Sequence, residues 1–521
     1  MWVFLLLTSF AMAQGLRLHS FFSPGMMMQR DAVTKVWGYD LVGSLDAKLI
    51  CQVQGKVVIH RLPTIRSMDG VWETELPPQA AATVCDFEAK SDTGSLFMSN
   101  IMFGDMWFCS GQSNMEMQME YIMNSTEEIE ASASFTSIRY AVIKNSVSTT
   151  ADLDADLPLE QSWSNPSDGE SLRWMSAVCF LYARSLQQLW QASGQEVVPL
   201  GLIDSDWSGT QVEGWSTPHS LESCSATIEC DDNWPQFCCD FNPQFCPSQL
   251  YNAMVVPLAR VALKGFLWYQ GEGNGGTNRD LYNCTFPAMI DDWRELFSLH
   301  SNTAPDAPFG FVQLASYRPD SVQAAWPVIR WHQTADFGYT PNDRQMNVFM
   351  ASPLDTYDDK QGFPGGVHSR YKQIVGERLA VAGMYVAYGI QNQGYRPFGP
   401  LPESVVLDRE NQIATVHYLE EIVYDNTEIS GFYICQDDPV TCDSGSSLAG
   451  WVEVAREAVT QVDKHILSIS LEWPSPPFSM AYAWRETPVK RYLGLPVYGN
   501  QEQFSLPSPP WKKLCVGDAC Y

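Results

Sequence analysis

Ser113 is the residue of this chain whose setting most favours chemistry. It lies in the short turn Cys109-Ser110-Gly111-Gln112-Ser113-Asn114-Met115, directly after a strand-like run at 106–108. A serine hydroxyl is a weak nucleophile until a neighbouring base takes its proton, and a turn of small residues after a strand can expose it. The alternative is that Ser113 caps the helix expected to begin near Met115, a frequent role for serine. The sequence therefore predicts a nucleophile at Ser113 if partner groups lie nearby.

His368 is the candidate base for this serine. It follows a predicted strand that ends near residue 355 and precedes a helix-like run at 372–379, so its imidazole would lie at a helix entrance on the same edge. His332, in Arg330-Trp331-His332-Gln333-Thr334-Ala335-Asp336, is the strongest rival, but it follows no clear strand end and a core position explains it equally well. We favour His368 because of its position after a strand end.

Glu272 and Asp355 are the candidates for the acid that would orient the histidine. A histidine base needs an acceptor that fixes its tautomer and stabilises the imidazolium. Glu272 lies between two glycines after a strand-like run, and Asp355 closes the last predicted core strand. A solvated acidic loop explains Asp355 and its neighbours Asp358 and Asp359 as well. Both acids therefore stay open.

Gly209 and Asn274 are the candidate donors for an oxyanion. The negative charge that develops on an ester carbonyl needs fixed donors, and a backbone N–H beside glycine or a side-chain amide suits that role. Both residues follow predicted strands, and the N–H of Ser113 would add a third donor. Ordinary turn chemistry is the alternative explanation.

One glycine-rich segment suggests a different ligand. Residues 271–276, Gly-Glu-Gly-Asn-Gly-Gly, satisfy the dinucleotide pattern G-x-G-x-x-G after a strand. Glu272 would bring a carboxylate to the pyrophosphate, and the downstream Asp291 and Asp292 lie inside a helical pattern instead of ending a second strand. No Walker loop or H-E-x-x-H motif occurs. We therefore expect no nucleotide, no metal and no other cofactor.

The elements that position these residues read as an α/β fold. Strand-like runs end near residues 109, 203, 269, 314 and 355, and between them apolar residues recur with helical spacing, at 172–186 and 281–297. Alternating strands and helices predict a parallel sheet covered by helices on both faces, a three-layer architecture. In such sheets the site lies beyond the carboxyl ends of the strands.

The chain is long enough for several units, and its composition changes along it. Residues 1–13 have the apolar core and small-x-small ending of a secretory signal peptide. Residues 14–100 read as a small β domain, 101–390 as the catalytic α/β domain with a cysteine-bearing insert near 220–247, and 391–521 as a β-rich C-terminal region.

Charge and cysteines indicate the compartment and exclude some partners. Sixty acidic against 32 basic residues give a net charge of −28, which disfavours nucleic acid and anionic membranes. Fourteen cysteines, none with zinc spacing, indicate disulfides whose connectivity the sequence leaves open. The sequons at Asn124 and Asn283 predict glycosylation. With no later membrane-spanning stretch, we expect a secreted or lysosomal protein.

Four segments together resemble the sialate O-acetylesterase family, which belongs to the SGNH-type hydrolases and is similar to bacterial acetylxylan esterases. They are Cys109-Ser110-Gly111-Gln112-Ser113-Asn114-Met115, Trp207-Ser208-Gly209-Thr210-Gln211-Val212-Glu213-Gly214-Trp215, Trp268-Tyr269-Gln270-Gly271-Glu272 and Arg330-Trp331-His332-Gln333-Thr334-Ala335-Asp336-Phe337-Gly338-Tyr339. The resemblance extends from about residue 16 into the C-terminal region.

The resemblance implies roles for individual residues. It makes Ser113 the nucleophile, His368 the base, and Gly209 with the Asn274 region the oxyanion hole. The chain departs from the family pattern in three places: Ser208 replaces a usual Gly, Gly273 replaces a usual Ser, and Gly365 stands three residues before His368 where SGNH enzymes have Asp. His368 also lacks the Pro that commonly follows it in the family.

The implied substrate is an O-acetylated sialic acid, whose carboxylate would need a partner such as Arg330 or Arg370. Acetylated xylan or another polysaccharide is the alternative within the same chemistry. An inactive glycan-binding protein is the alternative from another class. Acetate release by the parent protein, and its loss on removal of the Ser113 hydroxyl, distinguishes an esterase from a binding protein.

Overall fold

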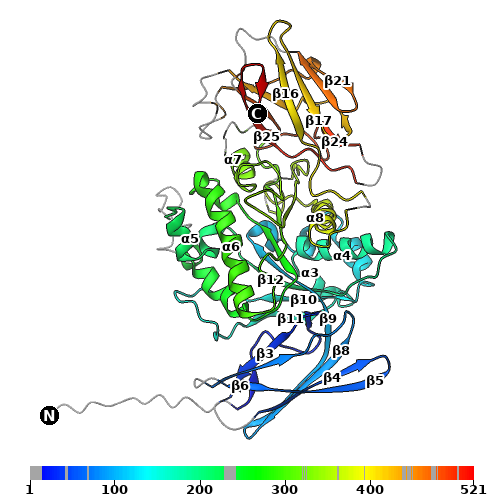
Figure 1. The fold of residues 1–521 in the computed structure, drawn as a ribbon, viewed down its shortest axis with the longest axis vertical. Helices are drawn as coiled ribbons and strands as arrows, with labels where there is room; N and C mark the ends of the chain where they lie inside the picture. The colour runs from blue at the N-terminus through cyan, green and yellow to red at the C-terminus, as the bar shows by residue number, and fades with distance from the viewer. Residues whose placement is uncertain are drawn as a thin grey trace, which may run out of the picture.

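The computed structural model shows an elongated molecule in which an α/β centre lies between two β-rich ends (Figure 1). It describes residues 15–521 except 41–44, 67–69, 228–241, 320, 322, 324, 361–362, 392–393, 437–441, 443–447, 449, 471–476, 478 and 501–503. The predicted signal peptide at 1–13 and the middle of the cysteine-bearing insert lie outside the described residues.

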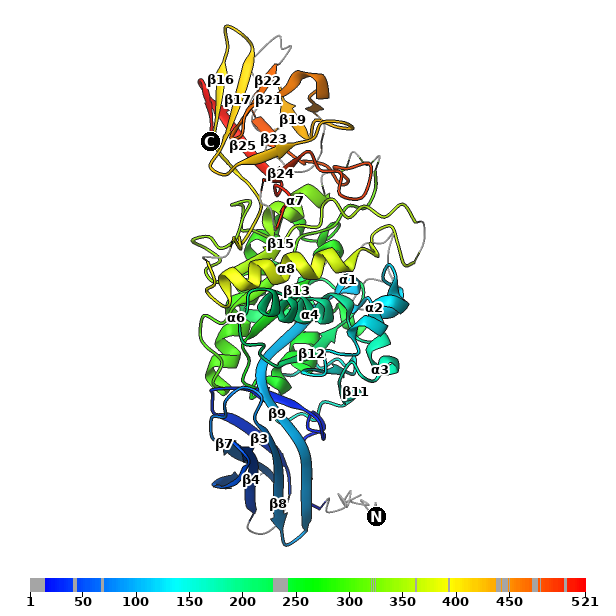
Figure 2. The same cartoon turned by 90° about the vertical axis from the view of Figure 1, so that its right-hand side faces the viewer.

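The N-terminal end is built from short strands and shares one long strand with the centre. Its strands are β1 (Arg17–Leu18), β2 (Met27–Gln29), β3 (Thr34–Tyr39), β4 (Asp46–Val53), β5 (Lys56–Leu62), β6 (Thr64–Arg66), β7 (Val71–Leu76), β8 (Val84–Ser91) and β9 (Gly94–Gly111). The 18-residue β9 pairs first with β8 and then enters the central sheet, which Figure 2 shows as one continuous ribbon. The domain boundary predicted at residue 100 therefore falls inside a strand.

The central sheet has the order β11-β10-β12-β9-β13-β14-β15. Its further strands are β10 (Ile138–Ile143), β11 (Leu159–Ser164), β12 (Leu200–Asp206), β13 (Gly265–Tyr269), β14 (Phe309–Val312) and β15 (Val348–Ala351). Neighbours along this path are parallel except for the edge strand β11, which runs antiparallel to β10. The predicted parallel α/β sheet is confirmed, although the sequence did not reveal β10 and β11.

Helices cover both faces of this sheet. They are α1 (Ser113–Glu116), α2 (Ser125–Ser132), α3 (Gly169–Arg173), α4 (Ala177–Ala192), α5 (Pro218–Ser223), α6 (Tyr282–His300), α7 (Ala325–His332) and α8 (Lys372–Val386). Successive residues of a strand point to opposite faces, so Trp107 of β9 packs in the core under α4 and α8 while Phe108 packs in the core under α6. The three-layer architecture follows from these two apolar cores.

The C-terminal end is a second β structure. Its strands are β16 (Pro402–Asp408), β17 (Ile413–Tyr418), β18 (Ile422–Tyr424), β19 (Phe432–Cys435), β20 (Trp451–Glu453), β21 (Val459–Asp463), β22 (Ile466–Ser470), β23 (Ser479–Tyr482), β24 (Val497–Gly499), β25 (Trp511–Val516) and β26 (Ala519–Cys520). The main sheet has the order β20-β19-β23-β25-β26-β16-β17-β22-β21, with β18 and β24 paired separately. This β-rich region begins near the position predicted from composition.

Each of the three parts of the chain contains at least one disulfide. The described pairs are Cys51–Cys85, Cys109–Cys179, Cys224–Cys284, Cys435–Cys442 and Cys515–Cys520. Disulfides of this number fit an oxidising compartment. Among the described residues, no helix is long and apolar enough to cross a membrane, and no cluster of ligand side chains could hold a metal ion.

Candidate active site

Ser113 begins α1 at the carboxyl end of β9. The chain turns there at Gly111, whose φ is +146° and whose added Cβ would lie 2.2 Å from the carbonyl oxygen of Tyr269. Only glycine allows this close approach to β13. Gln112, not Ser113, occupies the N-cap position, and its N–H donates to the Tyr269 carbonyl at 3.0 Å. The half-buried Ser113 hydroxyl has no hydrogen-bond partner among the described residues, so it is free to meet a base.

Asn114 links the serine turn to the turn after β13 and to the start of α8 with the loop before it. Its Nδ2 donates to Glu272 Oε1 at 2.6 Å and to the carbonyl oxygen of Val367 at 2.9 Å. Its Oδ1 accepts from Lys372 Nζ at 2.5 Å. Asn114 and Lys372 are completely buried. The side-chain amide next to the serine thus contacts the Glu272 turn and residues on both sides of His368 in the chain. The sequence did not predict this role of Asn114.

His368 lies in the loop that leads into α8. Its N–H donates to the Gly365 carbonyl at 3.1 Å, and its ring meets the Phe363 ring edge-on with centroids 5.2 Å apart. Within the described part of the chain, the imidazole nitrogens have no hydrogen-bond partner. Burial, together with the smaller effect of the positive charge of Lys372, lowers the pKa of His368 to about 4. The ring is therefore neutral, the form that a base requires, even in mild acid.

The backbone at Gly365, three residues before His368, leaves no room for the aspartate that SGNH enzymes have at this position. Its φ is +133°, and an added Cβ would lie 2.7 Å from the Lys360 carbonyl oxygen. A side chain at this position would meet both backbone strain and a steric clash. The loop conformation of this chain therefore has no room for the usual SGNH acid.

Glu272 opens the short 3₁₀ turn η7 (Glu272–Asn274) after β13. Its Oε1 accepts from Asn114, whereas its Oε2 is buried without a partner among the described residues. Burial raises the pKa of Glu272, and hydrogen bonding by Asn114 and the charges of Lys372 and Arg330 oppose that shift. Glu272 thus reaches the His368 loop through Asn114 and has no hydrogen bond to the imidazole.

Asp355 is occupied elsewhere. Its two oxygens accept from Arg378 at 2.5 and 2.7 Å, and Oδ2 also accepts from the Tyr498 hydroxyl at 2.6 Å. This buried carboxylate anchors α8 and the C-terminal β region, since Arg378 belongs to α8 and Tyr498 to β24. The expectation that Asp355 orients His368 is corrected, because both of its oxygens are taken by these partners.

Two backbone donors lie at the serine edge. The N–H groups of Ser113 and Gly209 donate to no acceptor among the described residues, and Gly209 has a φ of +78° in the loop after β12. The loops stay together because the Trp207 N–H donates to the Gly111 carbonyl at 3.1 Å. These unused N–H groups are the donors that an oxyanion hole requires.

Asn274 holds loops together. Its Nδ2 donates to Glu213 Oε2 at 2.9 Å and to the Thr277 carbonyl at 3.3 Å. Its Oδ1 accepts from the Val212 N–H at 3.0 Å and from Gln270 Nε2 at 2.7 Å. Because every polar atom of the buried amide is engaged, the oxyanion role expected of the Asn274 side chain is replaced by a structural one.

Gly273, a departure from the family pattern, lies against the loop that bears Gly209. An added Cβ at Gly273 would be 2.8 Å from the Thr210 carbonyl oxygen and 3.2 Å from that of Gly209. The Gly273 N–H donates to Gln112 Oε1 at 3.0 Å. Glycine therefore lets the turns after β9, β12 and β13 pack closely. Ser208, the neighbouring departure, is exposed.

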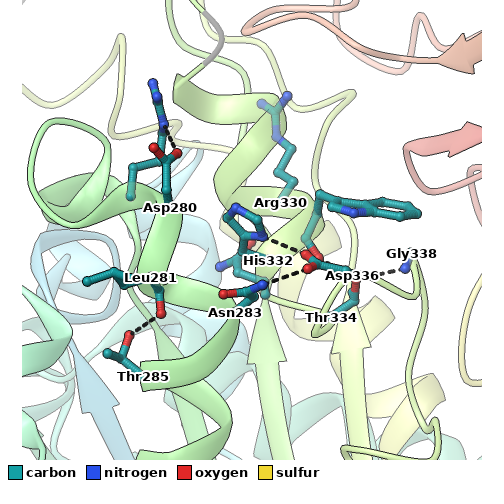
Figure 3. A network of polar contacts seen from close by, with 12 residues as sticks. Asp280, Leu281, Asn283, Thr285, Arg330, His332, Thr334, Asp336 and Gly338 are labelled. Atoms are coloured by element: carbon teal, nitrogen blue, oxygen red, sulfur yellow. Dashed lines mark hydrogen bonds and ion pairs between the residues drawn. The ribbon is translucent and has the colours of Figure 1, made fainter. Parts of the chain in front are cut away.

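The rival histidine belongs to a closed structural pair. His332 Nδ1 lies 2.5 Å from Asp336 Oδ1, and the Asn283 amide donates to Asp336 Oδ2 at 2.7 Å, so the three side chains tie the end of α7 to the start of α6 (Figure 3). A carboxylate partner alone does not make a base, since the structure gives His332 no contact with the Ser113 turn.

This same contact bears on the predicted glycosylation sites. Asn283 lies within α6, its amide is engaged by Asp336, and the sequon residue Thr285 is buried with its hydroxyl donating to Leu281 (Figure 3). Asn283 itself is half-buried, and its glycosylation stays a prediction. Asn124 is exposed at the start of α2, where its amide makes no capping bond, and its glycosylation stays a prediction.

The two arginines suggested for a substrate carboxylate already have partners. Arg330 is completely buried and donates to the carbonyl oxygens of four residues, Leu314, Ala315, Arg485 and Glu486. Burial lowers the pKa of Arg330 to about 9. Arg370 forms a two-pronged ion pair with the buried Asp358, with both distances at 2.7 Å. Arg330 joins the catalytic and C-terminal parts and is closed to a ligand, whereas the guanidinium of Arg370 is held by Asp358 and its side chain stays 23% exposed.

Comparisons with known proteins agree with this geometry. The family profile described as carbohydrate esterase, sialic acid-specific acetylesterase matches residues 103–380, and the sialate O-acetylesterase C-terminal domain profile matches residues 403–515. The sialate O-acetylesterase of Mus musculus is 34% identical over 442 residues, covering 78% of this chain and 80% of the mouse protein. That of Homo sapiens is 32% identical over 513 residues, covering 95% of this chain and 92% of the human protein.

A solved structure shares the whole architecture. A carbohydrate acetylesterase from Xanthomonas citri superposes with a TM-score of 0.73 at 23% identity, covering 96% of this chain and 100% of the bacterial one. The fold is therefore that of the SGNH-type carbohydrate esterases, and the chain is a carboxylic ester hydrolase. Within that class, it belongs to the sialate O-acetylesterase family.

Proposed function

We propose that this enzyme removes O-acetyl groups from sialic acids through an acetyl-serine intermediate. One observation carries the mechanism: the free Ser113 hydroxyl lies on a turn whose own N–H, together with the N–H of Gly209, has no acceptor among the described residues. The names of the mouse and human relatives support sialic acid as the sugar.

In the first half-reaction the Ser113 Oγ attacks the acetyl carbonyl carbon while His368 accepts the hydroxyl proton. The carbonyl oxygen becomes negative and is stabilised by the N–H groups of Ser113 and Gly209. The bond between the carbonyl carbon and the sugar oxygen then breaks, and His368 returns the proton to that oxygen. The products are the free sugar hydroxyl and an acetyl-serine.

In the second half-reaction a water molecule replaces the sugar. His368 takes a proton from the water, whose oxygen attacks the acetyl-serine carbonyl at the same pair of N–H donors. The ester bond to Ser113 breaks, the proton passes to the Ser113 oxygen, and acetate leaves. The enzyme returns to its starting state.

Asn114, Lys372 and Glu272 act as positioning residues in this mechanism. Asn114 fixes the loop carrying His368 through the Val367 carbonyl, and Glu272 and Lys372 hold the two ends of the Asn114 amide. A buried lysine beside the base also disfavours the imidazolium. The histidine is thus held by its loop and kept neutral, without a carboxylate on its ring.

The pKa shifts of several buried groups support activity in an acidic compartment or outside the cell. The low pKa of His368, about 4, leaves the base neutral at pH 5. Burial also raises the pKa of Asp204 in β12 to about 6 and raises that of its neighbour Asp206. A carboxyl whose pKa is higher in the folded than in the unfolded state stabilises the fold fully at pH values below its unfolded-state pKa. That stabilisation is lost as the pH rises through its folded-state pKa. These shifts and the disulfides support our proposal that the enzyme acts in the lysosome or outside the cell.

The test is acetate release from O-acetylated sialic acids and from acetylated xylan, at pH 5 and pH 7, by the parent enzyme and by Ser113→Ala. We expect release from the sialic acids and its loss in the variant. A preference for acetylated xylan would contradict sialic acid as the substrate but would leave the serine mechanism standing. An unchanged rate in Ser113→Ala would refute the serine mechanism, and an inactive parent that still binds glycans would indicate a binding protein.

A further inference from the structure

Phe363 is an exposed aromatic side chain at the edge of the proposed catalytic site. It is 62% exposed, although burying a phenyl ring is strongly favourable. Its ring meets the Tyr121 ring edge-on at a centroid distance of 5.3 Å, and it meets the His368 ring at 5.2 Å. Folding alone does not require an apolar surface beside a base. Exposed apolar groups in such places commonly mark binding surfaces.

The segments that carry these rings are fastened to one another. The Met123 N–H donates to the Arg370 carbonyl at 2.9 Å, and Gln373 Nε2 donates to the Met123 carbonyl at 2.5 Å. Tyr121 lies two residues before the first of these contacts, in the 3₁₀ turn η1 (Met119–Tyr121). The ion pair between Arg370 and Asp358 secures the other side. The aromatic pair therefore has a fixed place next to the base.

We propose that Tyr121 and Phe363 form an aromatic subsite that binds the C–H face of the sugar ring whose acetyl ester is cleaved. This inference rests on the proposed function, since His368 marks where the sugar oxygen leaves. Sugar rings carry faces of C–H groups that pack on aromatic rings, while their hydroxyls stay in water. Carbohydrate recognition therefore suits an apolar surface that remains half open.

The position of the subsite assigns it to the sugar and not to the acetyl group. The acetyl carbonyl must lie at the N–H groups of Ser113 and Gly209, whereas the departing sugar oxygen must lie within reach of His368. The Phe363 ring contacts the His368 ring and is itself 62% exposed, so we expect a group beyond the leaving oxygen to meet the phenyl ring. A contact that is made equally with the bound ester and with its transition state lowers KM and leaves kcat unchanged.

The test compares Phe363→Ala and Tyr121→Ala on two substrates, the O-acetylated methyl glycoside of sialic acid and ethyl acetate, which has no sugar. We expect KM for the glycoside to rise about 5- to 20-fold with kcat within about 2-fold, and kcat/KM for ethyl acetate to stay unchanged. Phe363→Tyr should restore the KM. Phe97→Ala is the matched control, because Phe97 is also 62% exposed but lies on β9 within the N-terminal β structure.

Other outcomes overturn the subsite. An equal loss on both substrates would show that the rings support the base or the acetyl group, and unchanged kinetics on both would show that they bind nothing. If the parent enzyme cleaves acetylated xylo-oligosaccharides and not sialic acids, the proposed substrate fails, and the same comparison with the xylo-oligosaccharide still decides the subsite. Thermal unfolding of each variant confirms that the exposed substitutions leave the fold intact.

Discussion

The loop before α8 and the end of α7 each present a histidine, and the two differ in how their rings are held. His332 has a carboxylate at 2.5 Å, further secured by Asn283, and resembles the base of a catalytic triad. His368 has no polar partner on its ring among the described residues, and its nearest charge is the lysine of Asn114's network. We propose that the better-paired histidine is the structural one. A base is identified by its access to the nucleophile and by its protonation state, and a carboxylate contact is insufficient.

The largest expected effect separates these two histidines directly. His368→Gln should reduce kcat/KM for an acetyl ester by about 10³-fold or more, because it removes the proposed base for the Ser113 proton. His332→Gln should stay within about 3-fold of the parent enzyme. Steady-state acetate release measures both. A comparable collapse in the His332 variant would reverse the assignment of the base.

The two carboxylates provide the next comparison. Glu272→Gln should lower kcat by roughly 10- to 100-fold, since it removes the charge that balances Lys372 and loosens the grip of Asn114 on the His368 loop. Asp336→Asn, which is matched in chemistry but whose carboxylate pairs with His332 and Asn283, should change kcat less than about 2-fold. If Glu272→Gln keeps the full rate, Glu272 has no positioning role.

The pH profile sharpens the contrast further. Lys372→Met removes a positive charge beside His368, so the pKa of the imidazole should rise from about 4 and the acid limb of kcat/KM should move upward by roughly one pH unit. Burial lowers the pKa of Lys372 itself to about 7, while the charges of Glu272 and Asp358 favour its charged form, so the shift should be clearest below pH 7. The ratio of rates at pH 5 and pH 7 reports the shift independently of expression level. His332→Gln is the control and should leave this ratio alone.

The smallest effect concerns stability. Asp336→Asn should lower the free energy of unfolding by about 1 kcal/mol or less at pH 7, because the pair with His332 is partly exposed and screened. Hydrogen bonding by His332 lowers the pKa of Asp336, so its contribution is present above the unfolded pKa and is lost as the pH falls through the folded value. Urea unfolding of parent and variant at pH 7 and pH 3 should show the difference closing in acid. A gap that widens in acid would contradict this pairing.

The sequence predicted the groups that depend on chain position. Ser113, Gly209, Glu272 and His368 each follow a strand of a parallel sheet, and parallel strands bring such ends to one edge. The parallel sheet and the β-rich ends were also predicted, from the alternation of strand-like and helical patterns and from runs of short strands, but the order of the strands was not. Strand β11 gave no clear signal, because it is a short edge strand with alternating polar residues, Leu159–Ser164.

The sequence could not show where individual polar atoms find partners. Asn114 and Lys372 lie 258 positions apart, and nothing local marks them as a pair. Asn274 and Asp355 stand at the expected strand ends, yet their side chains turn to Glu213 and Arg378. Hydrogen-bond partners at long sequence separation are fixed by tertiary packing, so a correct strand end does not guarantee a correct role.

The single strand β9 has a consequence for how the molecule comes apart. Its first half is a ladder partner of β8, and its last residues lie at the turn that presents Ser113. Unfolding of the N-terminal sheet would release one end of the central strand of the catalytic sheet, so the two should melt as one cooperative unit. Expression of the catalytic part from residue 101 onward would remove the first part of this strand. The N-terminal β structure therefore supports the strand whose end presents the nucleophile.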